Sequence, residues 1–180
     1  IFGVHKQFGP VSAANETITM NSQLIIGGAT TLTNLKLAGT GTLQVNNTMT
    51  VSGGLTLGGS TSLINVGKAT QSGGLTLGDS SGGATQFHNA GGAVWTLSDG
   101  PGVVLGNAAA TAFNFGTVQK TTGTGAATFG VALANNSKLA VSSGRLDFAA
   151  AVTGTGAASI LGASTLEFDA AVASGQTATF

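Results

Sequence analysis

The stretch that decides the fold is SGGLTLGGS at residues 52–60, which recurs as SGGLTLGDS at residues 72–80. The repeat therefore has a period of about 20 residues, and self-similarity at a fixed period of this length is the signature of a repeat architecture. Related triplets, in which one polar residue separates two apolar ones, stand one period before and one period after this pair, as LKL at 35–37 and WTL at 95–97.

The same period returns near the C-terminus, where GRLDFAAAV at 144–152 aligns with STLEFDAAV at 164–172. Between these regions the apolar triplets at 113–115 and 131–133 each arrive two positions early, so the period slips near residue 113. We therefore expect three continuous parts: an unassigned N-terminal segment or initial coil over 1–30, coils on a 20-residue grid over 31–112, and coils of slipped register over 113–180.

Within each repeat, apolar and polar residues alternate over short segments such as Leu43-Gln44-Val45, separated by Gly, Asn or Ser. This alternation predicts half-buried β-strands, and no window carries a capped helical pattern. Two or three strands per period fit one coil of a solenoid whose coils stack at roughly 4.8 Å. We predict an all-β, parallel right-handed β-solenoid (β-helix) of about 20 residues per coil and about nine coils. An antiparallel sandwich does not predict identical triplets at constant spacing.

In such a solenoid, residues one period apart lie above one another. Two inward ladders are expected, one of Leu55, Leu75 and Trp95 and one of Leu57, Leu77 and Leu97. An outward column of Thr56, Thr76 and Thr96 is expected between them, with Lys36 and Asn114 interrupting it. A flat array of threonines can bind ice, but that requires two columns, so surface β-propensity is the preferred interpretation. Asp79 and Asp99 are expected as a second stacked pair that caps turns.

The composition excludes several classes of function. Charged residues are 7 % of the chain, its formal net charge is zero, and it contains no Cys. We therefore expect no nucleic-acid partner, no disulfide scaffold, no thiolate zinc site and no redox pair. No apolar run approaches the roughly 20 residues of a membrane-spanning helix, so no membrane insertion by this segment is expected.

The repeat period predicts that one group of carboxylates lies close together. Asp147 and Glu167 are one period apart and are expected as stacked neighbours, a spacing comparable to that of the two carboxyl groups of retaining glycosidases. With Asp169 they are also the candidates for a Ca²⁺ site. The preferred interpretation is a pair of solvated surface carboxylates with Arg145 as a partial counter-charge. We therefore expect no catalytic residue and no cofactor.

Other catalytic motifs find no support. The two histidines, His5 and His88, lie outside any motif of a Ser-His-Asp triad. Glycine pairs are frequent, but none is followed by the Lys-Ser/Thr of a phosphate-binding loop. A non-enzymatic protein is therefore expected.

Several phrases carry a resemblance to a known group of proteins: GTGTL at 39–43, TGTGAA at 122–127 and 153–158, and LEF at 166–168 followed by AAV at 170–172. From about residue 30 onward the chain resembles the repetitive passenger regions of bacterial autotransporters and related large secreted adhesins. This resemblance implies a right-handed β-helical stalk on or outside a Gram-negative cell, with no shared catalytic residues. The phrase TVSGGLTL at 50–57 is also similar to phage tail-fibre repeats.

We therefore expect a non-enzymatic structural segment of an extended extracellular β-solenoid that presents or spaces an adhesive region and can associate through its ends. Its ligand, whether a glycan or a protein, stays open. Two alternatives remain: a phage tail-fibre or tailspike segment, expected as a trimer, and a polysaccharide-degrading β-helix lyase or hydrolase. The lack of an initial Met and the match of Phe180 to Ile160 lead us to expect a piece of a longer solenoid.

Overall fold

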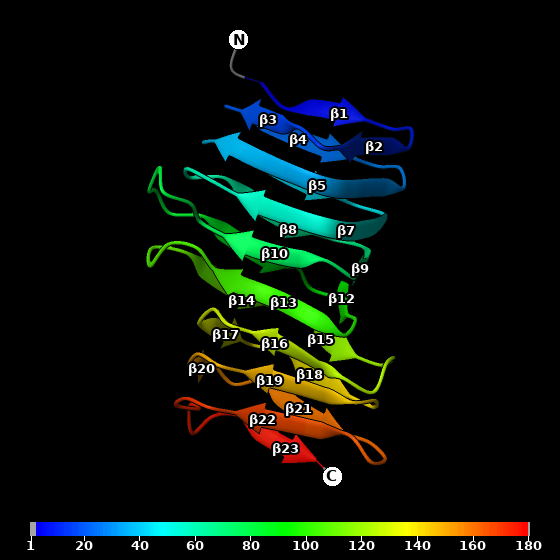
Figure 1. The fold of residues 1–180 in the computed structure, drawn as a ribbon, viewed down its shortest axis with the longest axis vertical. Helices are drawn as coiled ribbons and strands as arrows, with labels where there is room; N and C mark the ends of the chain where they lie inside the picture. Colours follow the sequence, from blue (N-terminus) through cyan, green and yellow to red (C-terminus); the bar gives the residue numbers. More distant parts are fainter. Residues whose placement is uncertain (1–2, 180) are drawn as a thin grey trace.

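The chain folds into a parallel β-solenoid with about nine turns of about 20 residues each. The structure, a computed structural model, describes residues 3–179, which form 23 strands and no helix. The strand nearest the viewer in each coil of Figure 1 runs to the left while the chain winds downward, so the coil is right-handed. The predicted fold class is confirmed. The expected match of Phe180 to Ile160 lies outside the described residues.

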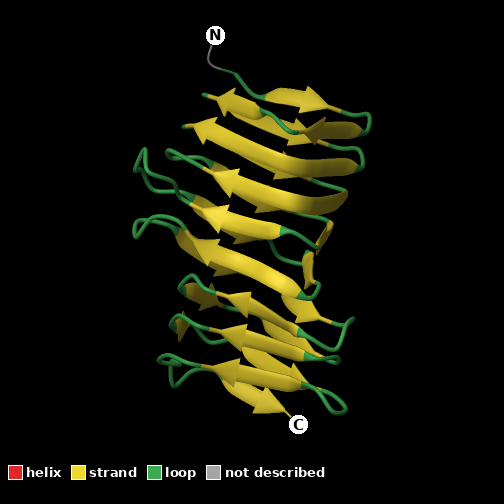
Figure 2. Ribbon diagram, in the orientation of Figure 1, coloured by secondary structure: helices red, strands yellow, loops and turns green. Residues whose placement is uncertain are grey.

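Three strand-bearing faces surround the core (Figures 1 and 2). The first face is an eight-stranded sheet of β1 (His5–Gln7), β4 (Gln23–Ile26), β6 (Thr42–Val45), β8 (Ser62–Asn65), β11 (Gln86–Asn89), β14 (Thr111–Asn114), β17 (Leu133–Asn135) and β20 (Val152–Thr153). The other two faces form one 15-stranded sheet, because the long strands β5 (Thr30–Gly39) and β7 (Thr48–Leu57) continue around the corner between them.

The second face contains the first halves of β5 and β7 together with β2 (Val11–Ala14), β9 (Lys68–Gln71), β12 (Val94–Leu97), β15 (Thr117–Lys120), β18 (Lys138–Val141), β21 (Ala157–Ile160) and β23 (Thr177–Thr179). The third face contains their second halves together with β3 (Thr17–Met20), β10 (Gly74–Leu77), β13 (Gly100–Leu105), β16 (Ala126–Phe129), β19 (Arg145–Phe148) and β22 (Thr165–Phe168). Strands β1 to β4 show that residues 5–26 already belong to the solenoid. Among the described residues there is no helix that could cross a membrane.

The register corrects the predicted position of Trp95. Leu55 does pair with Leu75, but the next residue in this ladder is Val103. Trp95 lies on the second face, between Ala69 and Val118. The one-period distance from Leu75 to Trp95 is therefore a coincidence between two triplets on different faces. The physical cause is a lengthening of the central coils, which moves the third-face partner of Leu75 from position 95 to position 103.

The neighbouring ladders change in the same way. Leu77 lies between Leu57 and Leu105, and Leu97 is paired with Gln71 on the second face. Thr96 is paired with Thr70, so the predicted outward column that joined it to Thr76 is wrong.

The longer coils lie in the centre of the chain and begin before residue 113. Along the first face the paired residues are Leu43, Leu63, Phe87, Ala112, Leu133 and Val152, so the spacing widens on either side of Phe87 and narrows again after Ala112. The extra residues lie in the loop between β10 and β11, which extends to the left in Figure 1, in the connection between β11 and β12, and at the start of β13, where the register shifts between Gly100 and Val103. The predicted 20-residue grid over 31–112 therefore fails for its last coils.

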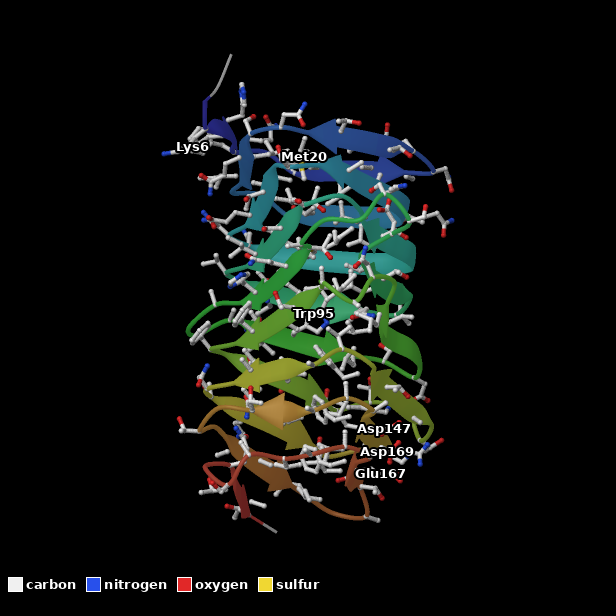
Figure 3. All side chains as sticks on the ribbon, turned by 90° about the vertical axis from the view of Figure 1, so that its left-hand side faces the viewer. Lys6, Met20, Trp95, Asp147, Glu167 and Asp169 are labelled. Atoms are coloured by element: carbon white, nitrogen blue, oxygen red, sulfur yellow. The ribbon has the colours of Figure 1, made fainter. Side chains whose placement is uncertain are left out.

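An aromatic row fills the lower half of the core. Phe87 packs edge-on against Trp95, with ring centroids 4.7 Å apart. The ring centroid of Phe87 is also 6.4 Å from that of Phe129. Phe148 continues the row, 5.5 Å from Phe129 on one side and 5.5 Å from Phe168 on the other. Trp95 and Phe87 are fully buried, and Figure 3 shows Trp95 inside the solenoid at mid-height. The large rings supply the apolar area that the many small residues do not.

Candidate functional site

Four buried asparagines form a hydrogen-bonded ladder along the solenoid axis, at the last inward position of the first face. Asn65 Nδ2 donates to Asn89 Oδ1 at 2.9 Å, and Asn89 Nδ2 donates to Asn114 Oδ1 at 2.9 Å. Asn114 Nδ2 then donates to Asn135 Oδ1 at 2.7 Å, and Asn135 Nδ2 donates to Gln176 Oε1 at 2.7 Å. Each amide also donates to a backbone carbonyl at the adjacent turn, for example Asn114 to Lys138 at 3.0 Å.

The ladder was not predicted from the sequence. Its members are 24, 25 and 21 residues apart and therefore lie off the predicted grid. The signal that could have revealed it is local: an Asn closes each first-face strand of the central coils, in LIN, FHN, AFN and LAN. An inward polar column is stable when its amides find partners, and here only Asn65 Oδ1, at the N-terminal end of the ladder, has none among the described residues.

The structure places the predicted carboxylate pair, Asp147 and Glu167, on adjacent strands. Asp147 on β19 is the register partner of Glu167 on β22, and Arg145 is bonded to Glu167 Oε2 at 2.6 Å. Asp147 is not solvated as expected, since it is only 7 % exposed. Its Oδ2 accepts from Thr128 Oγ1 at 3.3 Å, whereas its Oδ1 has no partner among the described residues.

Asp169 follows β22 and is exposed. Figure 3 shows Asp147, Glu167 and Asp169 on one side of the C-terminal coils. Within residues 3–179, no three or more His, Cys, Asp or Glu side chains form a group that could hold a metal ion. Because Arg145 already binds Glu167, the cluster is chemically an ion pair beside a buried carboxylate.

We expect Glu167→Gln to change the free energy of unfolding by less than about 1 kcal/mol, because an exposed ion pair contributes little and its loss also removes repulsion with Asp147. The melting temperature is expected to be the same in chelator and in millimolar Ca²⁺. Differential scanning fluorimetry of the wild type and the variant measures both quantities. A calcium-dependent rise of several degrees that disappears in the variant would instead establish a metal site.

Asp79 and Asp99 do not stack, because Asp79 follows a third-face strand and Asp99 follows a second-face strand. Asp79 Oδ2 is 2.7 Å from Lys36 Nζ, and its Oδ1 accepts from the backbone of Ser81 at 3.0 Å, so its predicted turn-capping role is confirmed. The Lys36 ammonium, followed by the Ser81 hydroxyl, lowers the pKa of Asp79 well below its usual range.

Asp99 binds a lysine that the sequence did not mark as buried. Lys120 occupies an inward position of β15, where Val141 is its register partner, and its side chain is fully buried. Its Nζ donates to Asp99 Oδ1 and to the carbonyl of Thr122, the latter at 2.6 Å. The Lys120 hydrogen bond, followed by that from the Gly125 backbone, lowers the pKa of Asp99.

The lowered pKa values of Asp79 and Asp99 lead us to expect that the solenoid loses stability in acid. Because both pKa values are lower in the folded state, the unfolded chain binds more protons as the pH falls below about 4, and stability is lost there. We expect the melting temperature to be steady above this range and to fall below it. Asp79→Asn is expected to lower the melting temperature at neutral pH and to flatten its acid dependence. A parallel pH profile for the variant and the wild type would contradict this assignment.

The outward side of the first face carries a small aromatic and apolar patch. His88 and Phe113 are register partners, and their rings stack with centroids 4.7 Å apart at an angle of 21°. Phe115 follows on the next outward position and is 47 % exposed. Backbone hydrogen bonds from Ala90 to Asn65 and from Phe115 to Asn89 continue the parallel register past the strand ends. We call this set the first-face patch; it consists of Ile64, Val66, His88, Ala90, Phe113 and Phe115.

The first-face patch is uncharged and is edged by polar side chains. Gln86 contacts His88 Nε2 through its Oε1 at 3.2 Å, and Gln44 donates to Asn46 at 2.8 Å near the patch. Burial lowers the pKa of His88, which favours the neutral imidazole. Strands β4, β6, β8, β11, β14, β17 and β20 contain no Lys, Arg, Asp or Glu.

The surface also has a hollow of about 580 Å³ over the N-terminal coils of the third face, lined by Asn15, Glu16, Thr17, Asn34, Leu35, Lys36, Gly54 and Thr56. Asn34 has a positive φ of 46° and joins adjacent coils, because its amide donates to Asn15 Oδ1 and its Oδ1 accepts from the Gly54 backbone, both at 3.1 Å. The lysine that lines this hollow is bound to Asp79. Asn34 and Lys36, which line the hollow, are therefore already bonded within the solenoid.

Comparison of the chain with models of protein families, with curated proteins and with solved structures gave no match.

Proposed function

We propose that this chain is a non-enzymatic structural segment of an extended extracellular β-solenoid, serving as a stalk or passenger of a bacterial surface adhesin. The observation that supports it best is the axial continuity of the molecule. The asparagine ladder links four successive coils from Asn65 to Asn135, Asn135 also donates to Gln176 two coils further on, and inward apolar ladders run beside it. Each coil then adds a fixed rise of roughly 4.8 Å, which suits a spacer.

The sequence resemblance to adhesin passengers supports the extracellular and bacterial part of the proposal. The sparse charge is consistent with it, because a charge repeated on each outward rung would repel its own copy. Lys36, Asp79, Lys120 and Asp99 are used within the solenoid as two ion pairs between coils. These charged groups therefore contribute to coil stacking.

A length measurement on a cell surface tests the spacer role. The chain is placed between an outer-membrane anchor and a tip epitope, and the height of the epitope above the membrane is measured by interference microscopy. About nine coils are expected to raise the epitope by about 43 Å. Residues 42–61 form one complete coil, because Thr42 pairs with Ser62 at the start of the next coil. Insertion of five further copies of this coil is expected to raise the epitope by about 24 Å more. An unchanged height in this longer variant would contradict the proposal.

Two further measurements separate the alternatives. A stable trimer of interleaved chains in analytical ultracentrifugation would favour a phage fibre, whereas a monomer or a linear filament is expected for a stalk. Release of reducing sugars from bacterial, plant or algal polysaccharides would favour an enzyme if Asp147→Ala or Glu167→Ala abolished it. We expect no such release.

A further inference from the structure

The corrected register places two columns of hydroxyl side chains side by side on the second face. The first column is formed by register partners on four successive coils, which are Thr31, Thr50, Thr70 and Thr96. The second column lies two residues further along each coil and consists of Thr33, Ser52, Ser72 and Ser98. We call these eight residues the second-face hydroxyl array. Coils are roughly 4.8 Å apart and alternate residues of a strand are about 7 Å apart, so the hydroxyls repeat in two directions.

The second column stays in register although it lies at the end of the strands. Thr33 pairs with Ser52 inside β5 and β7, and their hydroxyl oxygens are 2.8 Å apart. Ser72 and Ser98 directly follow β9 and β12. Each of them donates its backbone N–H, at 2.9 Å, to the carbonyl one residue before its partner in the preceding coil, which continues the parallel ladder. The four members of this column therefore lie one above another.

Both columns point outward. The residue between the two columns is buried in each coil, and side chains alternate between the two sides of a strand. These inward residues are Leu32, Val51, Gln71 and Leu97. All eight members of the array are exposed or half-buried. At the C-terminal edge, Thr96 accepts a hydrogen bond from Gln119 at 3.0 Å, and its hydroxyl keeps a proton to donate. The array therefore presents hydrogen-bonding hydroxyls to the solvent.

The array persists although the coils that carry it differ in length. Its first-column members are 19, 20 and 26 residues apart. Repetition of a unit of fixed length would not restore a threonine after the long coil, yet Thr96 is the register partner of Thr70. On the first face, by contrast, the outward register partners differ in chemistry and are Gln44, Ile64, His88 and Phe113. The second face therefore retains a pair of outward hydroxyls that the repeat period alone does not explain.

Strand propensity explains only half of the array. Threonine is favoured in strands, which accounts for the first column. Serine is not among the residues that strands favour, and Ser72 and Ser98 lie just beyond the strand ends. Their hydroxyls are better explained by a ligand that contacts both columns.

The chemistry of the array restricts that ligand. Over residues 30–33, 48–52, 68–72 and 94–98, no aromatic side chain points outward, and Lys68 at the edge is the only outward charged residue. The array therefore offers no ring on which a sugar could stack, no charge pattern for an ionic polymer and no apolar core for a protein interface. It offers rigid hydroxyls, because branching at Cβ restricts threonine side chains, and each hydroxyl both donates and accepts. These properties suit a surface that orders water.

We propose that the second-face hydroxyl array binds ice. The two repeat distances of the array, roughly 4.8 Å and about 7 Å, are close to the two unit-cell lengths of hexagonal ice. Hydroxyls fixed at these distances hold a first layer of water in positions that the crystal continues, and the ordered strands lower the entropic cost of this contact. The array is uncharged, as is the crystal face that it meets. This binding role goes beyond the spacer role, which needs no ligand on a lateral face.

Incorporation into growing ice tests the proposal. Ice is grown slowly on a cold finger from a dilute solution of the full chain, with lysozyme added to report trapped liquid, and both proteins are measured in the ice and in the liquid. The chain is expected to be enriched in the ice relative to lysozyme. Thr70→Lys places a long charged side chain in the middle of the array and is expected to abolish the enrichment. Thr111→Lys is the matched control, because Thr111 is an exposed threonine on β14 of the first face, and it is expected to keep the enrichment.

Circular dichroism melting of each variant shows whether the solenoid is intact, and Thr50→Lys, one coil away in the same column, replaces Thr70→Lys if that variant unfolds. An equal distribution of the wild-type chain and lysozyme between ice and liquid would overturn the proposal. Equal losses of enrichment for Thr70→Lys and Thr111→Lys would do the same, because the contact with ice would then not depend on the array. None of these results affects the epitope height on a cell surface, so failure here and failure of the spacer role are distinguishable.

Discussion

Trp95→Ala is expected to lower the free energy of unfolding by about 3–5 kcal/mol, the range for removal of a large buried aromatic side chain. Trp95 is fully buried, packs edge-on against Phe87, and donates through its indole Nε1 to Gln71 Oε1 at 2.8 Å. The truncation therefore leaves a cavity and also an unpaired buried carbonyl oxygen. The small residues on either side, such as Ala69, cannot expand to fill the space.

Urea denaturation followed by circular dichroism measures this change. Thr96→Ala is the matched control, because Thr96 is the next residue along the strand and points outward, where it accepts from Gln119 at 3.0 Å. It is expected to lower the free energy of unfolding by less than about 1 kcal/mol. A milder variant, Trp95→Phe, keeps most of the apolar contact and isolates the loss of the Gln71 hydrogen bond, expected at about 1–3 kcal/mol. Equal effects of Trp95→Ala and Thr96→Ala would show that the inward and outward register is wrong.

The fold class could be predicted because three signals agreed: a constant repeat offset, period-two alternation, and Gly or Asn between the strands. The register of the central coils could not. The triplet at 95–97 has the same apolar–polar–apolar pattern as the triplet at 75–77, and pattern alone does not say which face a strand occupies. The inserted residues, in the loop between β10 and β11, in the connection between β11 and β12 and at the start of β13, carry no periodic signal that would have marked them as insertions.

The candidate sites were harder to predict for a different reason: their chemistry depends on burial and on contacts between coils of unequal length. The pairing of Asp147 with Glu167 followed from the repeat period, but the burial of Asp147 did not. Lys120 occupies an inward position that hydrophobic patterning assigns to an apolar residue, and only its contact with Asp99 explains it.

The first-face patch depends on the contact of His88 with Phe113, which lie more than one period apart in the chain and so fall on no common grid. Their stacking becomes visible only when the lengthened coil between them is placed.

The ladder of asparagines leads to the second large effect. Asn114→Asp is nearly isosteric, yet we expect it to lower the free energy of unfolding at neutral pH by about 3–5 kcal/mol, the cost of a buried charge without a counter-charge. Asn114 is fully buried, and its Nδ2 donates to both Asn135 Oδ1 and the Lys138 carbonyl. A carboxylate there would have no donor to offer and would face two acceptor oxygens.

The pH dependence of this variant identifies the cause. Burial and the two facing oxygens favour the protonated acid, so the pKa of the new carboxyl is raised in the folded state, and the variant regains stability as the pH falls toward that pKa. This is the opposite sign to the acid loss expected from Asp79, so wild type and variant should converge between neutral pH and about pH 5. Asn136→Asp introduces the same change at an exposed position one coil further on, next to Asn135, and is expected to have little effect. If Asn114→Asp were as mild as this control, the buried ladder would contribute no more than ordinary surface hydrogen bonds, and the axial continuity of the solenoid would rest on its apolar ladders alone.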